Sequence, residues 1–222
     1  MPMNSGPKDK QVVSKQRVAD HGEVYTGARE VNAMLDLVKQ ETERIDSRFL
    51  EPACGTGNFL AEILARKLAV IEERYAGSQI EWERYAVLAV GSVYGIDILA
   101  DNVAACRQRL LTLFDRAYTG RYKRRARDEV RAVVGFVLGR NIIHGDALTL
   151  KSVGRPPEPI VFSEWSLVTG GFFKRRDFAF HELLHRANLK QLPLYAESGR
   201  EAFIPEPVRE FPLTHFLKLA EV

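Results

Sequence analysis

Apolar residues recur along the chain at two spacings, and segments of the two kinds alternate. Spacings of three or four residues, typical of amphipathic helices, occur from Ala28 to about Glu43 and at about 58–75, 81–90, 100–114 and 129–138. Between them lie short apolar runs typical of buried strands, at 48–51, 92–97, 141–146 and 160–162. Strands that alternate with helices favour an α/β fold with a doubly wound, mostly parallel sheet.

The pattern becomes weaker after Trp165. It predicts a helix at 178–189 and then a hairpin in which 192–195 pairs with 202–204. Residues 1–20 are polar and basic, and we expect them to be a flexible lead-in. Residues 21–222 have the length of a single domain with its own core.

Composition narrows the class of protein. Hydrophobic residues make up 45% of the 222 positions and charged residues 27%, the balance of an ordinary globular protein. No apolar run reaches the roughly 18 residues that a membrane span needs, and the N-terminus lacks the apolar segment of a secretory signal. The two cysteines, Cys54 and Cys106, form no CxxC pair, so neither a disulfide framework nor a cysteine-rich zinc site is expected. The prediction is a cytoplasmic protein without a membrane segment.

The net charge of +3 is small, but the positive residues cluster. One group lies within 121–131 and consists of Arg121, Lys123, Arg124, Arg125, Arg127 and Arg131, and a second is Lys174–Arg176. Such clusters contact phosphates in nucleic-acid-binding proteins, and they also occur on solvated helix faces. Sequence alone leaves both interpretations of the 121–131 segment open.

The most informative segment is the strand, turn and helix around Gly55 and Gly57. Glycines at such a turn let the backbone bend tightly and let a ligand approach closely. Leu60 stands where GxGxxG needs its third glycine, and no Gly-Lys-Ser/Thr follows, so a dinucleotide site and a P-loop are disfavoured. Glu51 at the strand end would repel a pyrophosphate, but it suits the ammonium and sulfonium groups of S-adenosylmethionine (SAM).

Two more acids stand at the ends of the next predicted strands. Asp97 ends the second strand, where a carboxylate can accept hydrogen bonds from both hydroxyls of a ribose. Asp146 ends the third, where it could accept a bond from an adenine amino group. Each also has a structural interpretation, Asp97 as a helix cap and Asp146 as a turn residue. Three acids at three successive strand ends would occur by chance less often than any one of them alone, and this favours a shared binding role.

These residues carry a resemblance to a known family. The segment Phe49–Leu60, FLEPACGTGNFL, closely resembles motif I of the adenine-N6 DNA methyltransferases of restriction-modification systems. Residues 94–97 (YGID) look like motif II and residues 145–148 (GDAL) like motif III. Residues 21–27 (HGEVYTG) resemble motif X, with Gly27 in place of the usual proline. The order of the motifs is that of the γ arrangement, and the resemblance covers roughly residues 21–150.

The resemblance implies a SAM-dependent methyltransferase fold of the Rossmann-like kind. It also implies methyl transfer from SAM to the amino group of an adenine flipped out of DNA. Thr26 would contact the methionine end of SAM. The cofactor site implied by the motifs consists of Thr26, Glu51, Pro52, Ala53, Gly55, Gly57, Asp97, Ile98, Asp146 and Ala147. The family implies no metal at this site.

The catalytic tetrapeptide of the family, Asn/Asp-Pro-Pro-Tyr/Phe, is absent. After the fourth predicted strand the sequence reads Ser163-Glu164-Trp165, and the only Pro-Pro pair precedes that strand. In an altered active site, Ser163 or Glu164 would accept the amine proton and Trp165 would stack on the base. Alternatively, the chain is a catalytically inactive SAM-binding scaffold or regulatory subunit, or its substrate is not an adenine in DNA. Ser163 could also simply cap a helix.

Two further expectations concern the segment after Trp165. About 55 residues follow it, too few for a target-recognition domain, so we expect a separate specificity or restriction subunit. His181-Glu182-Leu183-Leu184-His185 matches the H-E-x-x-H pattern of zinc metalloproteases, with Glu197 or Glu201 as a third ligand. This is a minor alternative, because the neighbouring apolar residues equally fit a core-facing helix.

Overall fold

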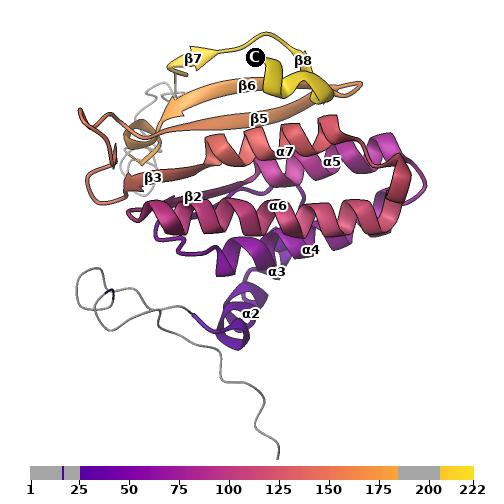
Figure 1. Cartoon of the computed structure of the whole chain (residues 1–222), viewed down its shortest axis with the longest axis horizontal. Coiled ribbons are helices and arrows are strands. Elements are labelled where there is room, and N and C mark those ends of the chain that lie inside the picture. Colours follow the sequence, from indigo (N-terminus) through magenta and orange to yellow (C-terminus); the bar gives the residue numbers. More distant parts are fainter. Residues whose placement is uncertain (1–16, 18–25, 185–205) are drawn as a thin grey trace, which may run out of the picture.

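Three short parallel strands form the centre of the fold. A computed structural model describes residue 17 and residues 26–184 and 206–222 of the chain (Figure 1). Strand β1 (Phe49–Glu51) pairs with β2 (Val93–Asp97), and β2 pairs with β3 (Ile142–Asp146), both in parallel. A two-residue strand, β4 (Lys151–Ser152), pairs antiparallel with β3. The chain is therefore an α/β protein with a mixed, mostly parallel four-stranded sheet, and this part of the prediction is confirmed.

Four long helices accompany these strands. They are α4 (Asn58–Tyr75), α5 (Gln79–Gly91), α6 (Ala100–Tyr122) and α7 (Asp128–Asn141), with a short 3-10 turn η1 (Lys123–Arg125) between the last two. Helix α5 ends just before β2 and α7 just before β3, so each runs almost directly into its strand. Helix α6 is longer than predicted because its buried face continues through Tyr118 and Tyr122.

The two faces of the central sheet have different coverings. Side chains alternate along β2, so Val93, Gly95 and Asp97 point to one face and Tyr94 and Ile96 to the other. On the first face a Cβ added at Gly95 would lie 3.0 Å from Cys54 Sγ and from a methyl of Leu60 in α4, so the helix packs directly on the strand. On the second face Tyr94 and Ile96 pack against Ile160, Phe162 and Phe180.

The covering of the second face is an antiparallel hairpin. Strand β5 (Val161–Thr169) pairs with β6 (Phe172–Ala179) along almost its whole length. Gly170 and Gly171 form the turn with φ of 55° and 93°, positive values that glycine adopts without strain. Figure 1 shows β5 and β6 on one side of the molecule and α4 and α6 on the other.

The hairpin corrects two sequence predictions. The apolar run at 160–162 was expected to extend the parallel sheet, but it leads into β5, whose partner is antiparallel. The helix predicted at 178–189 is wrong in its first residues, because β6 extends to Ala179 and helical structure covers residues 180–184. The physical reason is the glycine turn, which lets the chain fold back on itself locally. His185 and the hairpin predicted at 192–195 and 202–204 lie outside the described residues.

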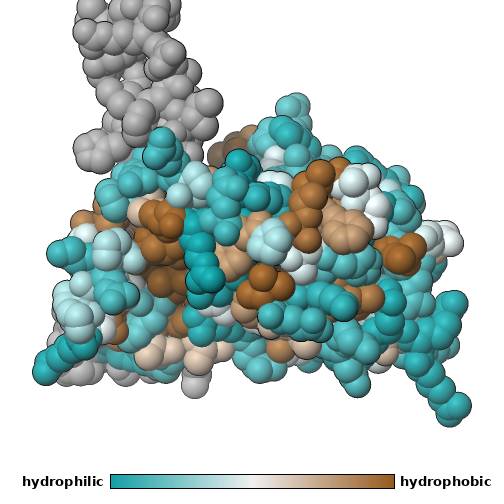
Figure 2. All heavy atoms as spheres, turned by 90° about the horizontal axis from the view of Figure 1, so that it is seen from above, coloured by the Kyte–Doolittle hydropathy of each residue, from teal (hydrophilic) through white to brown (hydrophobic). Residues whose placement is uncertain are grey.

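The C-terminal residues complete the second sheet. Strands β7 (Arg209–Glu210) and β8 (Thr214–His215) both pair with β6, and the 3-10 segment η3 (Phe216–Glu221) buries Phe216 and Leu219 in the main core. Figure 2 views the molecule from this side, where apolar groups are interrupted by hydrophilic side chains. The described surface there is thus not one continuous apolar patch.

Two short helices precede the sheet. They are α2 (Ala28–Asp36), which buries Val31 and Leu35, and α3 (Lys39–Thr42). Arg66 of α4 holds α2 in place, since its guanidinium donates to Asn32 Oδ1 at 2.9 Å and pairs with Asp36 at 2.8 Å. This anchor fixes where the chain enters the sheet.

A buried lysine fixes the loop that leads into β1. Lys67 on α4 is fully buried, and its ammonium donates to the carbonyls of Ile45 (3.2 Å) and Ser47 and to the hydroxyl of Ser92. Burial lowers the pKa of the Lys67 amine to about 7, whereas nearby Asp46 and Glu41 act in the opposite direction.

This shift predicts a specific dependence of stability on pH. An unfolded lysine has a pKa of about 10.4, so between pH 7 and pH 10 the unfolded chain binds more protons at this site than the folded chain does. Lys67 therefore makes the free energy of unfolding rise with pH across this window, by at most about 1.4 kcal/mol per pH unit. In Lys67→Met this contribution disappears, and urea unfolding at pH 6, 8 and 9 measures it as the difference between the two proteins. Parallel stability curves for wild type and variant would contradict the assignment.

Candidate functional site

The three acids expected to bind a cofactor lie along one edge of the central sheet. Glu51, Asp97 and Asp146 are the last residues of β1, β2 and β3, and the carboxyl ends of parallel strands share one edge. In the register, Glu51 is opposite Gly95 and Asp97 is opposite His144. Asp97 thus lies two residues after the register partner of Glu51, and Asp146 lies two residues after the register partner of Asp97. Because side chains alternate along a strand, all three acids point to the face that α4 covers.

The glycine turn closes onto this edge. The amide of Cys54 donates to the carbonyl of Ile96 at 2.9 Å, which extends the pairing of β1 with β2 into the turn. Gly55 and Gly57 have φ of 50° and 83°. A Cβ at Gly57 would lie 2.7 Å from Cys106 Sγ on α6, so both the backbone conformation and the packing require glycine there.

Asp97 connects the turn to the start of α6. Its Oδ2 accepts a hydrogen bond from the Gly55 amide at 2.8 Å, and its Oδ1 accepts from the Leu99 amide at 2.9 Å and from Asn102 Nδ2 at 3.2 Å. A carboxylate has about four acceptor positions, so one on Oδ2 remains for a further donor. The structural and the ligand-binding interpretations of Asp97 are therefore compatible.

The other two acids have different surroundings. Burial raises the pKa of the Glu51 carboxyl, and a hydrogen bond from the Ala53 backbone opposes the shift. A cation next to Glu51 would offset this desolvation. Hydrogen bonds from the Leu148 amide and the Thr149 hydroxyl lower the pKa of Asp146, and both belong to the turn that follows β3. Asp146 is thus a turn residue, which is one of the two roles considered for it.

The last two residues of the segment that resembles motif X, Thr26 and Gly27, are described, and they lie at the same place. Thr26 lies immediately before Gly27, the N-cap of α2, and its carbonyl accepts a hydrogen bond from Asn58 Nδ2 at 2.9 Å. Asn58 is the first residue of α4, directly after Gly57. Thr26 and the glycine turn are therefore neighbours, although about thirty positions separate them in the sequence.

The remaining predicted cofactor residues lie on the loops at this edge. Pro52 and Ala53 are exposed directly after β1, and Ala147 is half-buried after β3. Ile98 is exposed after β2, and its carbonyl lies 3.0 Å from His144 Nε2. The structure thus places the predicted cofactor residues on the strand ends, the turns that follow them and, for Thr26, the segment before α2 that contacts the start of α4.

The three residues predicted to replace the catalytic tetrapeptide lie elsewhere. Glu164 forms ion pairs with Arg48, which immediately precedes β1, and with Arg176 at 2.8 Å. The indole of Trp165 donates to Asn141 Oδ1 at 3.1 Å, and Asn141 immediately precedes β3. The Trp165 side chain also lies against Gly91, at the end of the helix that leads into β2. Arg48, Asn141 and Gly91 all stand at the amino ends of the parallel strands, the edge opposite to Asp97, whereas Arg176 belongs to β6.

Ser163 is similarly engaged in internal contacts. Its hydroxyl donates to Asp177 Oδ1 at 2.6 Å, and Asp177 also binds Arg175 through two bonds of 2.9 Å. The Ser163 carbonyl accepts from the hydroxyl of Tyr94 at 3.1 Å. Both Ser163 and Trp165 are buried, so the structure brings neither of them together with the cofactor residues.

Sequence reasoning missed three residues that shape this edge. Asn58 holds Thr26, Asn102 donates to Asp97, and Cys106 fills the space opposite Gly57. The available signal was weak. Asn58 directly follows the glycine turn, but nothing in the pattern pairs it with a residue in the preceding segment.

Three of the six residues in the basic segment pair with acids. Arg127 forms an ion pair with the fully buried Glu83, and Arg121 pairs with Glu72 at 2.8 Å. Arg131 pairs with Asp115 at 2.6 Å. Lys123, Arg124 and Arg125 remain exposed on η1. Half of the cluster therefore stabilises the packing of the helices.

The histidine motif lies only partly within the described residues. His181 and Glu182 belong to the helical residues 180–184, and His181 is exposed. Within residues 26–184 and 206–222, no group of three or more histidine, cysteine or acidic side chains is placed to hold a metal. His185, Glu197 and Glu201 are outside the described ranges.

In the part of the chain that the structure describes, no helix combines the length and apolar character needed to cross a membrane. No protein-family model, curated protein or solved structure matches the chain.

Proposed function

We propose that this chain binds SAM at the carboxyl edge of its parallel sheet, as the cofactor-binding part of an adenine-N6-type DNA methyltransferase. The observation that carries the proposal is the junction of the glycine turn with Asp97, whose carboxylate accepts the Gly55 amide at 2.8 Å. This bond fixes the acid beside a turn in which the backbone conformation and packing of Gly57 require glycine. The sequential order of β1, β2 and β3 supports a Rossmann-like methyltransferase fold.

The chemistry of the side chains at this edge fits SAM. The free acceptor position on Asp97 Oδ2 suits a ribose hydroxyl, and Glu51 offers a desolvated carboxylate to the ammonium and sulfonium groups. Thr26, held by Asn58 beside the start of α4, supplies polar groups for the methionine end. A dinucleotide would bring its pyrophosphate against Glu51, which disfavours that cofactor.

Methyl transfer needs a second set of groups that accept the protons of the adenine amine. Ser163, Glu164 and Trp165 have internal partners in the hairpin or at the amino edge of the sheet, and these partners support a non-catalytic role for all three residues. We therefore propose that the chain does not transfer methyl groups alone. A partner polypeptide, such as a specificity or restriction subunit, would supply the missing contacts to DNA.

Radiolabelled SAM tests the catalytic part of this proposal. The purified chain, incubated with labelled SAM and genomic DNA, is expected to transfer no label, and Glu164→Gln is expected to leave SAM affinity unchanged. Addition of a candidate partner subunit is expected to start transfer. Label incorporated into adenine by the chain alone, and lost in Glu164→Gln, would contradict the non-catalytic role of this segment.

A second candidate function is a SAM-binding scaffold or regulatory subunit. The internal contacts of Trp165 and Ser163 favour it, since neither side chain is available to a base. This candidate predicts SAM binding without methyl transfer in any combination of subunits. The same labelled assay, repeated with each partner, separates the two functions.

A further inference from the structure

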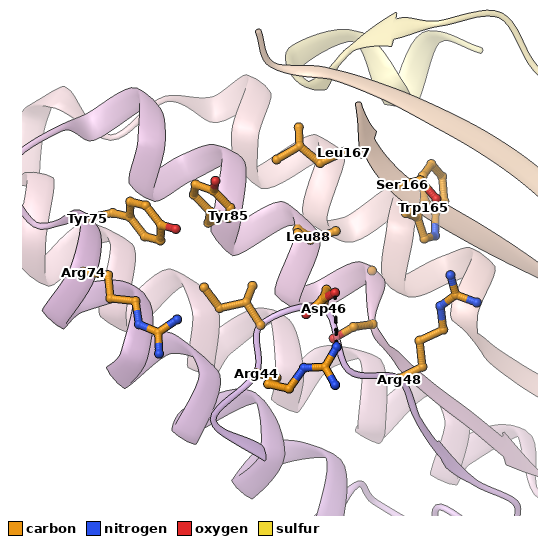
Figure 3. Close-up of a pocket in the computed structure, with 13 residues that line it drawn as sticks. Arg44, Asp46, Arg48, Arg74, Tyr75, Tyr85, Leu88, Trp165, Ser166 and Leu167 are labelled. Atoms are coloured by element: carbon orange, nitrogen blue, oxygen red, sulfur yellow. Dashed lines mark ion pairs between the residues drawn. The ribbon is translucent and has the colours of Figure 1, made fainter. Parts of the chain in front are cut away.

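A cleft of about 580 Å³ lies at the amino edge of the parallel sheet, opposite the proposed SAM edge (Figure 3). Its walls come from the loop between α3 and β1, the end of α4, helix α5 and the strand β5. The volume lies within the roughly 300–1,000 Å³ typical of small-molecule sites. The proposed SAM site lies at the opposite edge and does not account for this cleft, and of the three residues predicted to be catalytic only Trp165 is part of its lining.

The two sides of the cleft differ in chemistry. Figure 3 shows Tyr75, Tyr85, Leu88 and Leu167 along one side, and Arg44, Arg48 and Arg74 along the other. The two tyrosine rings are stacked, with centroids 4.0 Å apart and planes 13° apart, so this wall is a preformed aromatic surface. An apolar ring surface facing three guanidinium groups suits a ligand that is both planar and anionic.

The charges of the lining residues favour an anion. Arg44, Arg48 and Arg74 oppose a single lining acid, Asp46. Among the described residues, Arg44 forms ion pairs only with exposed acids, at 3.5 Å to Glu41 and 3.8 Å to Asp46, and such surface pairs contribute little. Arg74 is exposed and has no ion pair within the described residues. Arg48 pairs with Glu164, which Arg176 also neutralises.

We propose that this cleft binds a nucleoside phosphate, with the phosphate on the arginine side and the base against Tyr85 and Leu88. Guanidinium groups bind phosphate oxygens through paired hydrogen bonds, and aromatic and apolar walls bind bases of any sequence. The ligand is either a free nucleotide or the terminal unit of a single strand, since both present the same groups. The inference is independent of SAM binding, because the two sites lie at opposite edges of the sheet.

Calorimetric titration with thymidine 5′-monophosphate tests this proposal, because thymine avoids competition at an adenosine-binding SAM site. We expect the monophosphate to bind at least tenfold more tightly than thymidine or inorganic phosphate does. Arg74→Gln is expected to weaken binding of the monophosphate at least fivefold. Because the Arg74 side chain is exposed, the substitution should not unfold the protein, so a loss of binding reports on the cleft. Tyr85→Leu is expected to weaken the monophosphate and leave inorganic phosphate unchanged.

The matched control is Arg124→Gln, which removes the same charge from η1, outside the lining of the cleft. If Arg74→Gln and Arg124→Gln weaken nucleotide binding equally, the proposal is wrong. It is also wrong if inorganic phosphate binds as tightly as the nucleotide, or if the nucleotide does not bind at millimolar concentration. A 5′-phosphorylated octathymidylate then identifies the source of the ligand. Tighter binding than the monophosphate, lost in Arg74→Gln, assigns a single strand, and weaker binding assigns the free nucleotide.

Discussion

Replacing Glu83 with alanine is expected to lower the free energy of unfolding by about 1–3 kcal/mol, the usual cost of leaving a buried hydrogen-bonding group without its partner. Glu83 on α5 is fully buried and accepts hydrogen bonds from Arg127, from the Tyr118 hydroxyl and from Gln79 Nε2 at 2.8 Å. These contacts join α5 to α6 and to the start of α7. Without the carboxylate, the guanidinium and the hydroxyl lose their acceptor inside the helical layer.

Urea unfolding monitored by circular dichroism measures this effect. Glu129→Ala is the matched control, because the same substitution at an exposed position of α7 should change stability by less than about 0.5 kcal/mol. The double variant Glu83→Leu with Arg127→Met should be more stable than Glu83→Ala, since apolar side chains of similar size then replace both partners of the pair. If Glu83→Ala is no less stable than Glu129→Ala, the buried network does not hold these helices together.

The parallel strands and their helices could be predicted from the sequence because their signals are local. The strand ending at Glu51, the glycine turn and the helix at Asn58–Tyr75 are adjacent in the chain, and the structure places the helix at those bounds. The hairpin was missed for the opposite reason. Its buried polar residues, Ser163, Arg175 and Asp177, satisfy one another, and a hydrophobic pattern cannot show that polar side chains are paired inside the protein.

The same distinction applies to the candidate site. The residues at the strand ends could be predicted because a parallel sheet brings its carboxyl ends together. The contacts of Thr26 with Asn58 and of Gly57 with Cys106 depend on tertiary packing between distant segments. The pairing of the basic segment also escaped prediction, since its partners Glu72 and Glu83 lie about forty to fifty positions away in the sequence.

The proposed cofactor residues and the residues predicted to be catalytic therefore lie in different parts of the structure. The carboxyl edge combines the glycine turn with Asp97 and Glu51, and the segment that follows the predicted fourth strand contributes to the amino edge. The hairpin causes this division, because β5 crosses the face of the sheet instead of extending it. The proposed cofactor site therefore does not include Ser163, Glu164 or Trp165.

Asp97→Asn is expected to lower the affinity for SAM by about 10- to 100-fold, which corresponds to about 1.4–2.8 kcal/mol. An amide retains one acceptor oxygen, so it cannot both accept the Gly55 and Leu99 amides and bind a ribose hydroxyl. A hydrogen bond to a charged group contributes about 1.5–3 kcal/mol, in line with this loss. Asp128→Asn is the matched control, because it makes the same change on an exposed side chain of α7.

Calorimetric titration of SAM into the wild-type chain and these two variants tests the central claim most directly. We predict saturable binding of one SAM per chain, unchanged in Asp128→Asn and at least tenfold weaker in Asp97→Asn. Two results would contradict a cofactor site at the carboxyl edge. One is a folded wild-type chain that gives no heat of binding with millimolar SAM at two temperatures. The other is an Asp97→Asn variant that binds SAM as tightly as the wild-type chain does.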